Sequence, residues 1–99
     1  MPRKSQPTNH DKRVMREVRR LERAGWKVKA DLPGHERPAA IGRKNRIPDI
    51  EATKPGTRKL IEVETPESLA SDSKQQSTFR RSAAQRNRTT FELFVTDED

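Results

Sequence analysis

The stretch Ile47–Thr65, IPDIEATKPGTRKLIEVET, decides the fold because it predicts two short strands joined by a tight turn. Residues 54–57, KPGT, are a turn signal. Proline presets φ at the second position, and glycine accepts the positive φ that a type II turn needs at the third. If the two ends of this turn face each other, Asp49 lies opposite Glu62 in the resulting hairpin.

Strand side chains alternate between the two faces of a sheet, so Glu62 and Glu64 share one face, together with Asp49. We therefore expect these three carboxylates to converge on one patch. The residues between them point to the other face and predict a core: Ile50, Ala52, Ile61 and Val63.

Carboxylates held this close repel one another unless a cation lies among them. A divalent metal is one remedy, and oxygen ligands favour Mg²⁺ or Mn²⁺. The sequence has no cysteine, which argues against a thiolate zinc site. The alternative is a solvated acidic face on an edge hairpin, neutralised by Lys59 or Arg58.

The order Pro48-Asp49, then a short hairpin, then Glu62-Val63-Glu64 resembles the PD-(D/E)XK nuclease superfamily, which has the restriction-endonuclease-like fold. The layout is most similar to the small archaeal Holliday junction resolvases. The resemblance extends over roughly 14–95. It implies that Asp49 and Glu62 are catalytic metal ligands.

Glu64 departs from the family pattern, because most members carry a lysine there that helps to position or activate the attacking water. Some restriction enzymes carry glutamate at this position and remain active, so the resemblance keeps Glu64 as a catalytic candidate. Physically, Glu64 adds a third negative charge and increases the demand for a cation.

Two further site residues are implied by the resemblance alone. A glutamate on the first helix often completes the metal site, and Glu17 is the residue placed to do so; the alternative is an ordinary i to i+3 ion pair with Arg20. A glutamine followed four residues later by an aromatic residue lies near the scissile phosphate in some branches. Gln75 and Phe79 have this spacing, the alternative being a surface glutamine beside a core phenylalanine.

The charge balance points to a polyanionic partner. Lys and Arg outnumber Asp and Glu by 22 to 15 in 99 residues, which gives a net charge of +7 and a pI of about 10.4. Nucleic acid, most simply DNA, is the partner that we expect. Besides Gln75, the candidate nucleic-acid contacts are a ridge on the first helix, a basic loop and one arginine of a later helix: Arg13, Arg16, Arg20, Arg43, Lys44, Arg46 and Arg80.

The whole chain predicts an α/β restriction-endonuclease-like core with the order α-β-β-β-α-β and a mixed four-stranded sheet with flanking helices. Asn9 or Asp11 can cap a helix that runs to about Ala24 and ends at Gly25. A strand over 25–30, a long loop over 31–46 and the hairpin follow. A helix starting at Thr65 or again near Asp72 then runs to about residue 86, and residues 89–96 form the last strand.

The domain boundaries follow from composition. We expect residues 1–9 to be a disordered basic arm, residues 10–96 a single nuclease-like domain and residues 97–99 an acidic tail. No apolar run is long enough for a signal peptide or a membrane helix, so we expect a soluble, cytoplasmic protein without a membrane partner.

The leading functional hypothesis is a Mg²⁺-dependent (or Mn²⁺-dependent) DNA endonuclease that hydrolyses phosphodiester bonds. The alternative is a non-catalytic nucleic-acid-binding protein on a degenerate nuclease fold, and a third, a basic interaction module for protein or RNA, is supported by charge alone. A chain this short has little surface with which to recognise a substrate unaided, so a symmetric homodimer is compatible with either of the first two hypotheses.

Overall fold

The computed structural model describes residues 8–96. Most of the expected basic arm and the acidic tail, 1–7 and 97–99, lie outside the described residues. The elements are α1 (Asn9–Arg23), β1 (Lys27–Ala30), β2 (Ile50–Lys54), β3 (Thr57–Glu64), α2 (Pro66–Ser71), α3 (Ser73–Ala84) and β4 (Thr89–Val95).

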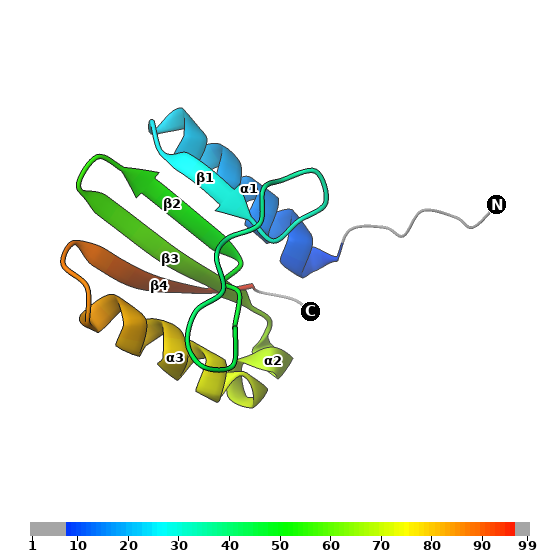
Figure 1. Cartoon of the computed structure of the whole chain (residues 1–99). Helices are drawn as coiled ribbons and strands as arrows, with labels where there is room; N and C mark the ends of the chain where they lie inside the picture. Colours follow the sequence, from blue (N-terminus) through cyan, green and yellow to red (C-terminus); the bar gives the residue numbers. More distant parts are fainter. Residues whose placement is uncertain (1–7, 97–99) are drawn as a thin grey trace.

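The four strands form one mixed sheet in the order β1-β2-β3-β4. β1 and β3 are antiparallel to β2, whereas β4 is parallel to β3. The chain is therefore α/β, with a four-stranded mixed sheet and flanking helices, as predicted. Figure 1 shows α1 lying against one side of the sheet and α3 against the other.

The hairpin has the predicted register. Ile50 pairs with Ile61, and Glu51 pairs with Leu60. The glycine of the turn, Gly56, has a φ of +77°, as the type II turn requires. The core face predicted from this register is confirmed, since all four of its expected residues lie in the larger core: Ile50, Ala52, Ile61 and Val63.

Because neighbouring residues of β3 point to opposite faces, each side of the sheet has its own core. Ile61 and Val63 belong to the larger core, beneath the Val14, Val18 and Leu21 stripe of α1. On the other face, Leu60 packs with Phe79 of α3 and with Ile41.

Two helix predictions need correction. The cap of α1 is Thr8, not Asn9 or Asp11: its extended backbone (φ −72°, ψ 166°) lets its side chain accept from the Asp11 N–H. Asn9 thus belongs to the helix and not to the arm.

The single helix predicted between β3 and β4 is instead two, α2 and α3, with a break at Asp72. The break has a packing reason. None of the described side chains of α2 is buried, whereas α3 buries Phe79 and Ala83 against the sheet. The contacts that hold α3 against the sheet therefore do not extend to α2. The second helix start predicted near Asp72 is the point at which α3 begins as a separate helix.

The segment between β1 and β2, expected to be a long basic loop without strands, contains a small hairpin. Ile41 and Arg46 exchange two backbone hydrogen bonds of 2.7 and 3.0 Å. The Ile41 side chain is buried in the core beneath α3, and Gly42 follows with a φ of +78°. The segment lies against α3, and Figure 1 shows it running beside that helix.

We predict that Gly42→Ala destabilises the protein more than Gly34→Ala. Both glycines have positive φ, which costs alanine roughly 1–2 kcal/mol. At Gly34 a Cβ atom would meet nothing within 4 Å, whereas at Gly42 it would lie 2.9 Å from Thr78 Cγ2. Thr78 cannot easily turn away, because its hydroxyl donates to the Lys74 carbonyl oxygen.

Urea unfolding of both variants measures the difference. We expect Gly42→Ala to lose at least about 1 kcal/mol more of unfolding free energy than Gly34→Ala. Equal losses would mean that the small hairpin does not pack against α3 in solution.

Candidate functional site

Two carboxyl groups meet where β2 begins and β3 approaches its end. Asp49 directly precedes β2, and Glu62 lies in β3 with only 2% of its surface exposed. The two carboxyl groups lie close enough that each shifts the pKa of the other. Asp49 Oδ2 also accepts a hydrogen bond of 2.8 Å from the Val63 N–H. The turn geometry therefore brings Asp49 and Glu62 together, as the register predicted.

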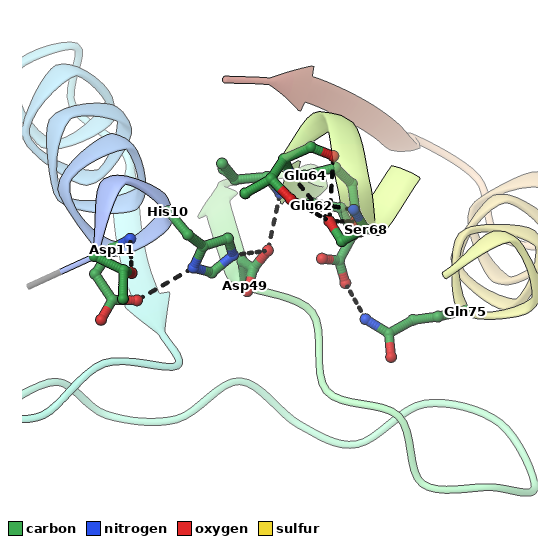
Figure 2. Close-up of polar contacts among 10 residues, drawn as sticks. His10, Asp11, Asp49, Glu62, Glu64, Ser68 and Gln75 are labelled. Carbon is green, nitrogen blue, oxygen red and sulfur yellow. Dashed lines mark hydrogen bonds and ion pairs between the residues drawn. The ribbon is translucent and has the colours of Figure 1, made fainter. Parts of the chain in front are cut away.

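Both flanking helices reach this pair, as Figure 2 shows. His10, in the first turn of α1, lies with Nε2 3.2 Å from Asp49 Oδ2 and Nδ1 3.1 Å from Asp11 Oδ1. From α3, Gln75 Nε2 donates a hydrogen bond of 3.0 Å to Glu62 Oε1. Each carboxyl group is thus oriented by a side chain from a different helix.

The third carboxylate, Glu64, is turned toward α2. Its Oε2 accepts a hydrogen bond of 2.5 Å from the Ser68 hydroxyl, and the side chain is buried. Ser68 is itself fixed by the start of α2, where its N–H donates to Thr65 Oγ1, the predicted cap. Glu64 therefore joins the patch at one side and has a hydroxyl partner of its own.

Proton positions resolve the repulsion that the sequence predicts. Burial and the neighbouring Asp49 raise the pKa of Glu62 from 4.5 to about 10, so Glu62 is neutral at pH 7. Burial would raise the pKa of Asp49, but hydrogen bonds from His10, Glu62 and the Val63 amide outweigh it and hold the pKa below its ordinary value. Asp49 is therefore the charged member of the pair.

A histidinium balances that charge. The hydrogen bond to Asp49 raises the pKa of His10 from 6.5 to about 9, against the opposing effect of burial. The pKa of Glu64 is raised by burial and by the nearby charges of Asp72 and Asp49, partly offset by the Ser68 hydrogen bond. Without a metal, the proton on Glu62 and the imidazolium of His10 therefore offset the repulsion among the carboxylates.

The donor set fits a metal held by few protein ligands. Among residues 8–96, no three His, Asp or Glu side chains are gathered into a group that could hold a metal ion. Mg²⁺ commonly binds through one or two carboxylates and keeps several waters. Asp49 and Glu62 would supply the two carboxylates of that arrangement once Glu62 has lost its proton.

Glu17, the third metal ligand implied by the resemblance, is not brought to this pair. Its buried carboxylate accepts from Arg13 Nε at 3.1 Å and from Arg20 Nε at 2.8 Å. The i to i+3 ion pair with Arg20 is therefore what the structure contains. The same contacts engage two arginines of the predicted basic ridge, whereas Arg16 is exposed and makes no ion pair with the acidic side chains of residues 8–96.

A basic cleft of about 1210 Å³ lies beside the site, between α3 and the small hairpin of the β1–β2 segment. The predicted loop residues Arg43, Lys44 and Arg46 line one wall. The opposite wall and the floor add four more basic side chains: Lys74, Arg81, Arg86 and Arg58. Arg80 is not part of the lining; its guanidinium lies over the Phe91 ring, 5.1 Å from the centroid.

The cleft and the carboxyl pair are neighbours along α3. Ser73 and Lys74 line the cleft, and the next residue, Gln75, bonds to Glu62. Of the residues that orient the carboxylates, sequence reasoning missed His10 and Ser68. Ser68 carried a signal, because its spacing from Thr65 is that of a reciprocal helix cap. His10 carried none, since it lies 39 residues from its partner.

We predict that stability falls as the pH rises from about 6.5 to 9 in metal-free buffer. The folded state keeps the Glu62 proton, whose pKa is about 10, whereas an unfolded glutamate loses it near pH 4.5. The stabilisation is therefore complete at low pH and is lost as the pH rises, by about 1 kcal/mol per pH unit. His10, with its pKa raised to about 9, acts in the same direction.

Glu62→Gln should reduce this slope to the contribution of His10, because an amide can donate to Asp49 without titrating. Chemical denaturation in EDTA at several pH values measures the slope. Glu22→Gln, an exposed change of the same charge, is the control and should keep the wild-type slope. A wild-type slope in Glu62→Gln would show that Glu62 does not hold a proton in the folded state.

Comparisons of the chain with protein-family models, with curated proteins and with solved structures find no match. Within residues 8–96, no helix is long and apolar enough to cross a membrane.

Proposed function

We propose that this protein is a Mg²⁺-dependent endonuclease of the PD-(D/E)XK type that hydrolyses phosphodiester bonds in DNA. The observation that carries the proposal is the contact between Asp49 and Glu62 beside the basic cleft. The sheet order and the parallel last strand agree with the restriction-endonuclease-like arrangement that the motif resembles.

Asp49 and Glu62 would hold the metal, which when bound polarises a phosphate and lowers the pKa of a water. His10 would fix the orientation of Asp49, and Gln75 that of Glu62, as orienting groups commonly do for metal ligands. Glu64, held by Ser68 in the place of the family lysine, would accept a proton from the attacking water. The cleft arginines and lysines would hold the nucleic-acid backbone.

The proposal predicts that purified protein nicks supercoiled DNA in Mg²⁺ and not in EDTA. Asp49→Asn removes a ligand charge at nearly constant shape and should reduce cleavage at least about 100-fold. Gln75→Ala removes only an orienting contact and should reduce it about 10-fold to 100-fold. Glu22→Gln is the matched surface control and should cleave like the wild type.

Metal binding can be measured without cleavage. Trace Mn²⁺ should broaden amide NMR signals near Asp49, Glu62 and Glu64, relative to a Mg²⁺ control, and Asp49→Asn should abolish that broadening. Cleavage that Asp49→Asn leaves intact would refute the proposed site and point to a contaminating nuclease.

A second function is favoured by the environment of Glu64. A carboxylate bonded to Ser68 stands where most members of the resembled superfamily have a lysine, which suits a non-catalytic nucleic-acid-binding protein on the same fold. This alternative predicts that the wild-type protein binds DNA but does not cleave linear, flapped or branched substrates in Mg²⁺ or Mn²⁺. It also predicts that the Asp49→Asn variant binds DNA with the same affinity as the wild type.

A further inference from the structure

All the charged side chains that line the basic cleft are positive. Its lining contains seven Lys or Arg residues and no acidic residue. Arg58 is neutralised by Glu51, with Nε 2.7 Å from Oε2. Within residues 8–96, the other six make no ion pair with an acidic side chain. Unpaired cations this close together repel one another, and a polyanion in the cleft would relieve that repulsion.

The uncharged part of the lining indicates which polyanion. Apart from Ile41 and Gln85, it consists of small or hydroxyl-bearing residues such as Gly42 and Ser77, and it has no aromatic side chain. Proteins that bind single strands usually stack bases on aromatic rings. A lining of cations and hydroxyl groups suits phosphates and sugars, which carry no sequence information directly. Such a cleft leaves the bases outside, where they can stay paired.

The two walls are held at a fixed separation. Ile41 is buried beneath α3, and the Gly42 backbone approaches Thr78 so closely that a Cβ atom there would lie 2.9 Å from the Thr78 methyl. The loop cations Arg43 and Lys44 therefore face α3 across a formed cleft. Preorganised walls avoid the cost of ordering a loop when a ligand binds.

We infer that the cleft binds the sugar-phosphate backbone of one strand of a nucleic-acid duplex, without sequence preference. The inference rests on the proposed partner class, nucleic acid, and deepens it by assigning the binding surface and the strand state. Lys74 of the cleft lining is followed on α3 by Gln75, which donates to Glu62, so one end of the cleft lies within one helical residue of the carboxyl pair. The basic ridge of α1 is not the binding surface, because Glu17 engages two of its arginines.

The test compares two triple variants with the same charge change. Arg43, Arg81 and Arg86 are exposed residues of the two cleft walls, and all three become Gln in the first variant. In the second, the exposed α1 residues Arg16, Arg19 and Arg23 become Gln. Fluorescence anisotropy then measures binding to a short DNA duplex, its RNA counterpart and the single strand at several salt concentrations, in EDTA so that no cleavage occurs.

We expect the cleft variant to bind either duplex at least about tenfold more weakly at about 100 mM salt. Its slope of log affinity against log salt should fall by about 3, one unit for each lost phosphate contact. The α1 variant should stay within about threefold of the wild type, and scrambled duplexes should bind alike. The affinities of the wild-type protein for the DNA duplex and for the RNA duplex show which of the two it prefers. A preference for either duplex over the single strand supports the inference.

Three results would overturn it: equal losses in the two variants, a larger loss in the α1 variant, or tighter binding of the single strand than of either duplex. Amide NMR of the wild-type protein with duplex provides a check that needs no variant, since shifts should gather in residues 39–46 and 73–86. Shifts confined to α1 would also overturn it. Failure of wild-type cleavage in Mg²⁺ would sink the nuclease proposal and leave this result standing.

Discussion

The rest of the structure depends on the burial of Asp49 against Glu62. Two carboxyl groups in contact within a protein are tolerable when one proton is shared and every remaining lone pair has a partner. Here the Val63 amide and His10 serve Asp49, while Gln75 serves Glu62. Because His10 comes from α1 and Gln75 from α3, the pair ties helices on opposite sides of the sheet to one end of the hairpin. Both helices therefore contact the same titrating pair.

Net charge alone says little about where a partner binds. The chain carries arginines on both sides of the sheet, but their surroundings differ. On α1, Arg13 and Arg20 flank the buried Glu17 and behave as part of a structural ion-pair cluster. Across the sheet, the cleft between α3 and the Ile41–Arg46 hairpin has no acidic lining. The same residue type therefore serves internal stability on one face and remains available to a ligand on the other.

Local features were predictable from the sequence, and contacts between distant elements were not. The KPGT turn sets the register, so the convergence of Asp49 with Glu62 follows by counting. The i to i+3 spacing of Glu17 and Arg20 also predicted their ion pair. Because Glu17 forms this ion pair, it does not reach the carboxyl site. The approach of His10 to Asp49 depends on how α1 packs across the sheet, which no local pattern encodes. The break at Asp72 arises because packing holds α3 but not α2, and residues 31–46 gain their hairpin from the burial of Ile41.

The parallel pairing of β4 with β3 has a consequence for the order of folding. Every pair, from Arg58 with Thr89 to Glu64 with Val95, joins residues 31 apart in sequence (89 − 58 and 95 − 64). The β2–β3 hairpin has a two-residue turn and can close within about 1–10 μs, whereas β4 must wait for a long loop to close with both helices inside it. Burial is the main cause of the raised pKa of Glu62, and α3 contributes Gln75 to its surroundings. Closing this long loop is therefore coupled to the uptake of a proton by Glu62, so the docking of α3 and β4 is also an acid–base reaction.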